Sequence, residues 1–205
     1  MIDFPLATER LLLRPLEPGD EAELHETLAD PTTLAAVGRE PPWTREQTRD
    51  SIERRIGEQR EHGFSMWAVV ERESGSVVGI CGLQPIERTG PEVEIGWHVH
   101  PDARGRGYAT EAARVALAAG FERLGLERII AVTSPDNGRS RRVMEKIGLA
   151  YEGPSDYYGG TVLYAAGGSG SRGTGMTAPS AENVSGSREP GSTTTPSAGS
   201  PTQQA

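Results

Sequence analysis

A glycine-rich loop is the feature of this 205-residue sequence best suited to binding a ligand. It reads Arg104-Gly105-Arg106-Gly107-Tyr108-Ala109, and Thr110 stands where a dinucleotide-binding fold would need a third glycine. The unpaired N–H groups and the positive dipole end of a helix that starts here would attract phosphate. Small residues at 105, 107 and 109 would let the backbone approach a pyrophosphate, and the two arginines add positive charge. The alternative is a tight strand-to-helix turn with solvated arginines.

The segment before this loop, Glu92–Val99, alternates polar and apolar residues as a strand does. Glu94 and His98 would share one face with Gly96, while the apolar residues between them face the core. An imidazole suits proton transfer near neutral pH, although a histidine at such a place more often only lines a pocket. His98 and His100 could form a metal pair, but no third ligand has a fitting spacing, so we expect no metal site.

A second helix start follows further along the chain, at Asn137-Gly138-Arg139-Ser140. Asn137 is a good N-cap, and this structural role alone would explain it. Arg139, Arg141 and Arg142 form a basic cluster. It could meet a phosphate, or its members could be solvated on the helix surface.

The elements that must position these residues alternate between strands and helices. The pattern predicts an α/β domain with a mixed sheet and no internal repeat. A strand at Arg10–Leu16 precedes a helix that Asp20 would cap, and Thr44 and Gln47 have capping-box spacing before a helix that Gly63 ends. The remaining elements are strands at Ser65–Glu71, Val77–Ile86 and Glu92–Val99, a helix from Gly107 to Leu124, a strand at Arg128–Thr133, a helix at Asn137–Ile147 and a closing antiparallel pair from Tyr151 to Tyr164.

The composition changes at residue 165. From Ala165 to Ala205, Gly, Ser, Thr, Pro and Ala occupy 32 of 41 positions, and no aromatic residue occurs. Such a segment buries too little surface to offset its ordering entropy, so we expect a folded domain at 1–164 and a disordered tail at 165–205. The four charges of the tail cancel, so the whole net charge of −8 belongs to the domain.

The same counts exclude several classes of protein. The net acidity argues against nucleic-acid binding and suits a cationic substrate better than an anionic one. No apolar run approaches the roughly 18 to 20 residues that span a bilayer. The lone Cys81 cannot form an internal disulfide, so we expect a cytoplasmic protein, with Cys81 and Trp67 buried in the core.

Four segments resemble the GCN5-related N-acetyltransferase (GNAT) superfamily, in particular its RimJ/RimL-like branch. Arg104, Gly107 and Ala109 match the acetyl-CoA loop of that family, Arg/Gln-x-x-Gly-x-Gly/Ala. The others, in the order of the family, are TERLLLRPLEPGD, NGRSRRVMEKIGL and YEGPSDYYG. The resemblance implies a mixed, mostly antiparallel central sheet with a splay between its central strands, flanked by helices.

The resemblance also implies roles for individual residues. The strand before the loop would pair with the pantetheine arm of acetyl-CoA, and Glu94 beside the splay would be the general base; an exposed strand glutamate is the alternative. Many members carry a general-acid tyrosine where this chain has Met144, which cannot donate a proton, so Ser140 or water would serve the leaving thiolate. Trp43 would line the acceptor pocket together with His98, and Tyr157 and Tyr158 would either border the acceptor cleft or pack. The expected acetyl-CoA contacts are Trp97, His98, Val99, Arg104, Gly105, Arg106, Gly107, Tyr108, Ala109, Thr110, Asn137 and Arg142.

The predicted function is that of an acetyl-CoA-dependent N-acetyltransferase without a metal. It would acetylate a primary amine, either a protein N-terminus or a small molecule, by direct attack in a ternary complex. The alternative is a non-catalytic acyl-CoA-binding or regulatory module, which the missing tyrosine keeps open. We expect no nucleic-acid or membrane partner and either a monomer or a homodimer.

Overall fold

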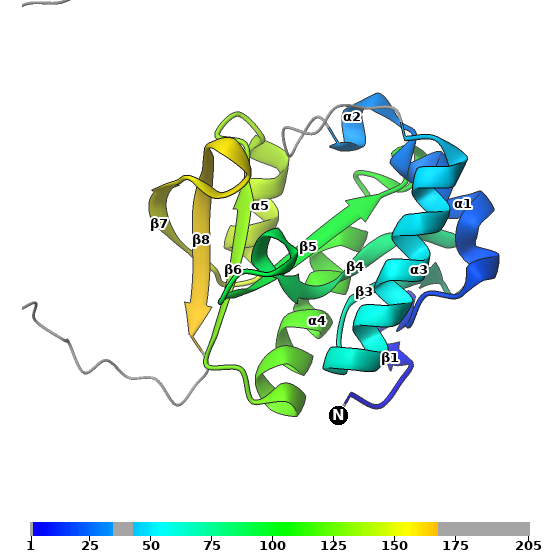
Figure 1. Ribbon diagram of the computed structural model, residues 1–205, viewed down its shortest axis with the longest axis horizontal. Helices are drawn as coiled ribbons and strands as arrows, with labels where there is room; N and C mark the ends of the chain where they lie inside the picture. The colour runs from blue at the N-terminus through cyan, green and yellow to red at the C-terminus, as the bar shows by residue number, and fades with distance from the viewer. Residues whose placement is uncertain (1, 35–42, 168–205) are drawn as a thin grey trace, which may run out of the picture. The chain divides into compact units, whose positions relative to one another are not determined.

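The computed structural model describes residues 2–34 and 43–167 of the chain. Their core is a sheet of eight strands in the order β1-β2-β3-β4-β5-β6-β8-β7 (Figure 1). The strands are β1 Leu6–Ala7, β2 Leu11–Arg14, β3 Met66–Glu71, β4 Val77–Pro85, β5 Val93–Val99, β6 Arg128–Thr133, β7 Ala150–Ser155 and β8 Thr161–Gly167. Neighbouring strands run antiparallel except β5 and β6, which are parallel. The predicted mixed, mostly antiparallel sheet is confirmed.

Helices cover both faces of this sheet (Figure 1). They are α1 Glu21–Leu28, α2 Pro31–Leu34, α3 Arg45–His62, α4 Tyr108–Leu124 and α5 Gly138–Lys146. On one face, α4 and α5 pack on the largest apolar cluster, which includes Trp67, Cys81 and Ile95. On the other face, α1 and α3 enclose a second cluster around Ile52 and Ile80, and a third cluster around Ile130 lies further along the sheet.

Local sequence signals explain where several helices begin and end. Gln47 N donates to Thr44 Oγ1 at 3.2 Å and Thr44 N donates to Gln47 Oε1 at 2.8 Å, so the predicted capping box opens α3. Gly63 ends this helix with a φ of 77°, a left-handed conformation that glycine adopts without strain. Asn137 Oδ1 accepts from Ser140 N at 3.1 Å and caps α5 as predicted.

Two expectations were wrong in detail. Asp20 precedes α1 but makes no side-chain cap, because its carboxylate accepts instead from Arg14 and from Glu17 N. The last strand, β8, continues to Gly167, three residues beyond the predicted end of the domain. Ala165 is buried there and pairs with Ile130 and Ala150. The rest of the predicted tail lies outside the described residues.

Candidate active site

The central strands β5 and β6 separate at the middle of the sheet. Glu94 and Ile130 are the one pair that places these two strands in register, whereas β4 and β5 align at seven positions. The predicted splay is therefore present. Two cavities open beside it, a larger one of about 310 Å³ and a smaller one of about 80 Å³.

The larger cavity follows the glycine-rich loop and the first turns of α4 and α5. Of the twelve residues expected to contact acetyl-CoA, all except Arg106 line it. These are Trp97, His98, Val99, Arg104, Gly105, Gly107, Tyr108, Ala109, Thr110, Asn137 and Arg142. Arg139 and Lys146, which stand beside Arg142 at the α5 end, add further positive charge.

The loop has the backbone geometry that a phosphate site needs. Gly105 and Gly107 have φ values of 78° and 86°, in the left-handed region where a side chain would be strained. Gly107 is also the N-cap of α4, so the N–H groups of the first helical turn point out of the helix at the cavity end. A helix N-terminus together with Arg139, Arg142 and Lys146 suits an anionic nucleotide, so the residues present fit acetyl-CoA.

The two loop arginines both bond to protein groups. Arg104 lines the larger cavity, but its Nη2 donates to Asp30 Oδ1 at 3.1 Å and to Thr33 Oγ1 at 2.6 Å. Hydrogen bonds from Thr32 and then from Arg104 hold the pKa of Asp30 below its usual range. Arg106 lies outside the cavity lining, since its guanidinium pairs with Glu71 at 3.6 Å. The expected cofactor contact of Arg106 therefore has no support in this geometry.

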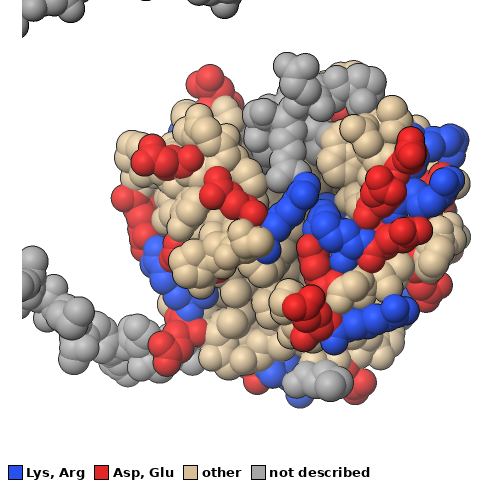
Figure 2. All heavy atoms as spheres, viewed as in Figure 1, with Lys and Arg blue, Asp and Glu red and all other residues tan. Residues whose placement is uncertain are grey.

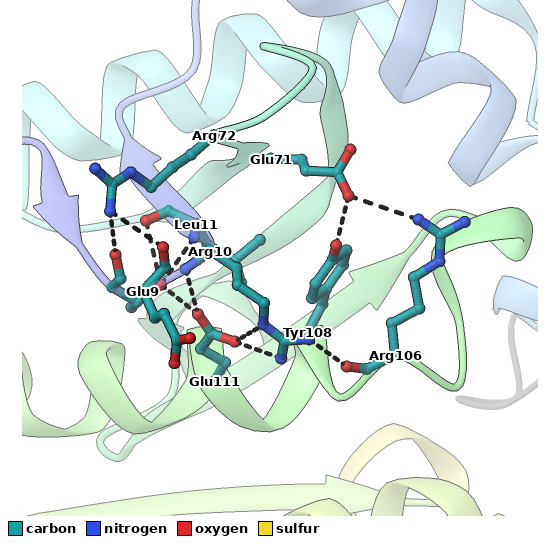
Figure 3. A network of polar contacts seen from close by, with 9 residues as sticks. Glu9, Arg10, Leu11, Glu71, Arg72, Arg106, Tyr108 and Glu111 are labelled. Carbon is teal, nitrogen blue, oxygen red and sulfur yellow. Dashed lines mark hydrogen bonds and ion pairs between the residues drawn. The ribbon is translucent and has the colours of Figure 1, made fainter.

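A polar cluster on the outer side of the loop holds it against the sheet (Figure 3). This Arg10 cluster consists of Arg10, Glu71, Arg106, Tyr108 and Glu111. Arg10 donates through Nη1 to the Arg106 carbonyl at 2.9 Å, and through Nε to Glu111 at 2.8 Å. Its guanidinium also lies over the Tyr108 ring, 4.8 Å from the centroid, and the Tyr108 hydroxyl donates to Glu71. The cluster thus ties the loop to the start of β2 and the end of β3.

The smaller cavity contains the predicted base. Glu94 is 5% exposed and lines this cavity. Gln84 Nε2 donates to its Oε1 at 2.7 Å, and the Tyr158 hydroxyl donates to the same oxygen. Two neutral donors from β4 and from the turn before β8 therefore orient the carboxylate. The alternative of an exposed strand glutamate is wrong.

The two cavities meet at three residues. Trp97, His98 and Ser140 line both of them, with His98 at the end of β5 and Ser140 in the first turn of α5. An acyl group delivered from the larger cavity would reach the smaller one at this junction. Met144 is buried and lines the smaller cavity, at the place where the resemblance would expect a tyrosine.

Other sequence interpretations have mixed outcomes. Trp43 packs against the cluster under α1 and α3 and lines neither cavity, so the structure does not bring it to the site. Tyr158 borders the smaller cavity, whereas the Tyr157 hydroxyl donates to Glu92 at 3.0 Å. Arg141 turns away from the larger cavity to donate to the Tyr164 hydroxyl at 3.0 Å. Cys81 and Trp67 are buried as predicted, and burial raises the pKa of the Cys81 thiol.

Among the residues of the smaller cavity that sequence reasoning missed are Arg54, Arg55, Gln84 and Arg88. They come from α3, β4 and the turn after β4, and no local motif connects them. Within residues 2–34 and 43–167, no group of three or more His, Cys, Asp or Glu is placed to hold a metal ion. No helix in these ranges is both long and apolar enough to cross a bilayer.

The fold, the splay and the loop define an acetyltransferase of the GNAT family. The chain belongs to this family, because the model of the acetyltransferase (GNAT) domain matches residues 10–150. GNAT acetyltransferases use acetyl-CoA as co-substrate, and the protein is thus an acetyl-CoA-dependent acyltransferase.

Among individual proteins, the chain is 33% identical over 150 residues to the "uncharacterized N-acetyltransferase YnaD" of Bacillus subtilis strain 168, covering 72% of this chain and 84% of that one. It is 28% identical over 141 residues to spermidine N(1)-acetyltransferase of Escherichia coli K12, covering 69% and 73%. A GNAT-family acetyltransferase crystal structure from Bacillus anthracis superposes with a TM-score of 0.69 at 29% identity, covering 80% and 98%. A RimL structure, a ribosomal L7/L12 acetyltransferase, shares the fold with a TM-score of 0.65 at 20% identity, covering 78% and 91%.

Proposed function

We propose that this protein transfers the acetyl group of acetyl-CoA directly to a primary amine within a ternary complex. The observation that carries the proposal is the junction of the two cavities at Trp97, His98 and Ser140. One cavity has the charge and shape for the nucleotide, and the other places a buried carboxylate next to the junction. A direct transfer needs both substrates present together, and two cavities that share these three lining residues would hold them side by side.

Residues of the larger cavity would hold the co-substrate, which supplies the thioester acetyl group when bound. The N–H groups at the start of α4 would bind the pyrophosphate, and Arg139, Arg142 and Lys146 would neutralise phosphate charge at the α5 end. The exposed edge of β5 beyond Glu94 would align the pantetheine arm through backbone groups of Trp97 to Val99.

Glu94 would accept the proton that the amine loses, directly or through a water molecule. An amine is mostly protonated near neutral pH, so a nearby base is needed for attack. Gln84 and Tyr158 hold the carboxylate in place, and His98 lies four residues further along β5 on the same strand face. His98 would line the path between the amine and the thioester.

Ser140 would donate a hydrogen bond to the sulfur that leaves. Its backbone N–H is bonded to Asn137 Oδ1 at the start of α5, and the residue lines both cavities. A hydroxyl can donate such a bond where Met144 cannot. We infer that Ser140, or a water that it orients, replaces the family's tyrosine.

The acceptor would be a protein N-terminus or a small amine. The name of the spermidine N(1)-acetyltransferase relative, at 28% identity, supports the inclusion of small amines in any screen. The lone buried cysteine supports a reducing cytoplasm as the site of action. The protein would act as a monomer or a homodimer.

The test is release of free thiol from acetyl-CoA in the presence of a panel of N-terminal peptides, polyamines, aminoglycosides and amino acids. Acceptor-dependent release is expected for the wild type, with loss of most turnover in Glu94→Gln. General bases contribute about 10²- to 10⁴-fold, so kcat should fall by at least about 100-fold. Glu92→Gln is the matched control, because Glu92 contacts Arg128 and Tyr157 and lines neither cavity. Binding of acetyl-CoA without thiol release with any acceptor would indicate a non-catalytic module instead.

A further inference from the structure

The smaller cavity is more basic than the acidity of the whole chain would suggest. Among the described residues that line it are three arginines, Arg54, Arg55 and Arg88, and one acidic residue, Glu94. Figure 2 shows Lys and Arg side chains gathered at the centre of this face, between α3 and the side of β6 and β8, with Asp and Glu side chains around them. Three arginines therefore line this cavity, while other Lys, Arg, Asp and Glu side chains are distributed over the rest of the face.

The arginines differ in how they are held. Arg54 forms an ion pair with Glu58 one turn further along α3. Arg55 is 5% exposed and donates to Ser51 on the same helix. Burying a guanidinium is costly, and a helix residue at this position could easily be apolar. The buried charge of Arg55, which lines the cavity, therefore points to a role there.

Arg88 reaches the cavity from a strained turn. Among the described residues, the non-glycine residues with positive φ are Glu87, Arg88 and Tyr158, at 51°, 73° and 52°. Such conformations are strained and tend to occur at functional sites, where the surrounding structure holds them.

Reciprocal hydrogen bonds between the two turns supply that support. Glu87 N donates to the Tyr158 hydroxyl at 3.0 Å, and Tyr158 N donates to Glu87 Oε1 at 2.8 Å. The turn after β4 and the turn before β8 are thus fastened to each other, with Arg88 and Tyr158 both lining the smaller cavity. Two segments about seventy residues apart in the sequence are held in strained conformations at this one site.

We propose that the acceptor carries an anionic group, a carboxylate or a phosphate, beside the amine that is acetylated. Arg55 and Arg88 bind this anionic group while Glu94 takes the proton of the amine. A guanidinium can hold a carboxylate or phosphate through two parallel hydrogen bonds, which fixes the orientation of a small molecule. The inference rests on the proposed function, which it narrows from amines in general to zwitterionic or amino-phosphate acceptors.

Size and charge both favour this class over a polyamine. The smaller cavity measures about 80 Å³, which suits a small molecule or one end of a larger one. A polyamine would place additional positive charge next to Arg88 and next to the buried Arg55, and this repulsion is unfavourable. The net charge of −8 led us to expect a cationic substrate, and the lining of the cavity argues against that expectation.

The experiment compares acceptors matched except for the anionic group, with kcat/KM expressed per concentration of unprotonated amine, because amidation also lowers the pKa of the neighbouring ammonium group. Each amino acid in the panel is paired with its amide, and phosphoethanolamine is paired with ethanolamine. Thiol release gives kcat/KM for each member. A hydrogen-bonded ion pair of this kind corresponds to about a 10- to 100-fold preference for the anionic member. Comparing the amino acid pairs with the phosphoethanolamine pair shows whether the site prefers a carboxylate or a phosphate.

Three variants and one control test whether the arginines cause this preference. Arg88→Gln should reduce it at least about tenfold, and Arg88→Glu should reverse it; Arg88 is an exposed residue, so both should fold. Arg55→Lys keeps the buried positive charge but cannot form the two parallel hydrogen bonds of a guanidinium. It should therefore give a preference for the anionic acceptor between those of wild type and Arg88→Gln. Arg60→Gln removes an exposed arginine of the same helix outside the cavity lining and should leave the preference unchanged.

The outcomes separate the two proposals. Equal or better acetylation of the uncharged members, or a preference that survives Arg88→Glu, overturns the inference and leaves the proposed function intact. Absence of acetylation with every acceptor, anionic or uncharged, contradicts the proposed function and the inference that rests on it. A preference for anionic members that depends on Arg88 supports both.

Discussion

Glu111 provides a test of how the phosphate loop is held. Its carboxylate accepts from the Thr8 hydroxyl at 2.6 Å, from Arg10 N at 3.0 Å, and from Arg10 Nε and Nη2 at 2.8 and 2.6 Å. Glu111→Gln keeps one acceptor oxygen but replaces the other with a donor. The two side-chain contacts of Arg10 would therefore be lost, and with them the position from which Arg10 Nη1 reaches the Arg106 carbonyl in the loop.

The expected size of the effect follows from the exposure of the pair. The Arg10 side chain is 44% exposed and that of Glu111 is 17%, so solvent screens the charge interaction. Losing an exposed ion pair changes an equilibrium constant by a factor of about five at most. Loosening the hydrogen bond to the Arg106 carbonyl adds a similar or smaller factor to the affinity for acetyl-CoA. We expect KM for acetyl-CoA to rise about five- to tenfold, with kcat within about twofold of wild type.

The assay is steady-state thiol release at saturating acceptor, with Glu122→Gln as control because Glu122 is exposed on the same helix. An unchanged KM for acetyl-CoA in Glu111→Gln would refute the positioning argument. A fall in kcat at unchanged KM would refute it equally, because Glu111 lines neither the larger nor the smaller cavity.

The same contact predicts a pH dependence of stability. Desolvation by burial acts to raise the pKa of Glu111, but hydrogen bonds from Thr8 and Arg10 outweigh it and the pKa is lowered from 4.5. A carboxylate with a lowered pKa in the folded state stabilises the fold fully above its unfolded pKa and loses that contribution as the pH falls through the folded pKa. The Tm difference between wild type and Glu111→Gln should be present at pH 7 and should shrink below about pH 4.5.

Three further predictions concern packing and capping. Asn137→Ala removes the cap on Ser140 N and should lower the free energy of unfolding by about 1 kcal/mol in a denaturant titration; an unchanged midpoint would contradict the capping role. Gly82→Ala would place its Cβ 2.2 Å from the Ser65 carbonyl oxygen and should lower Tm by several degrees. In Gly96→Ala the atom nearest to the new Cβ is Met66 Cε at 3.5 Å, so Tm should be unchanged while kcat/KM for the acceptor falls. Equal Tm values for the two variants would contradict this prediction. Cys81 should react with a thiol reagent only after unfolding, since it is buried and its pKa is raised, and rapid labelling of the native protein would disprove this.

Local signals made much of the fold predictable from the sequence. The Thr44–Gln47 capping box, the αL glycine at 63 and the Asn137 cap are determined by residues within one turn of each other. The glycine-rich loop is also a local motif, so the sequence alone predicts most of its residues that line the larger cavity. Arg106 is the exception, because its pairing with Glu71 depends on where the end of β3 lies.

The acceptor side could not be predicted in the same way. Arg55, Arg88 and Tyr158 come from a helix and two turns that only the folded chain brings together. Their positions depend on the strained turns and on the bonds between Glu87 and Tyr158, which no spacing rule indicates. Only the resemblance implies a place for Trp43 in the pocket, and its packing under α1 and α3 does not bring it there.

The splay also has a consequence for how the protein responds to its co-substrate. Because β5 and β6 share one register pair, the sheet consists of two halves, β1 to β5 and β6 to β8, with a narrow connection at Glu94 and Ile130. A ligand arm bound along β5 would act as the missing length of strand and bridge the halves. Binding would then stabilise the native state by mass action, about 2.7 kcal/mol at a hundredfold excess over Kd. Amide hydrogens of β5 and β6 should be the ones whose exchange slows most when the co-substrate is added.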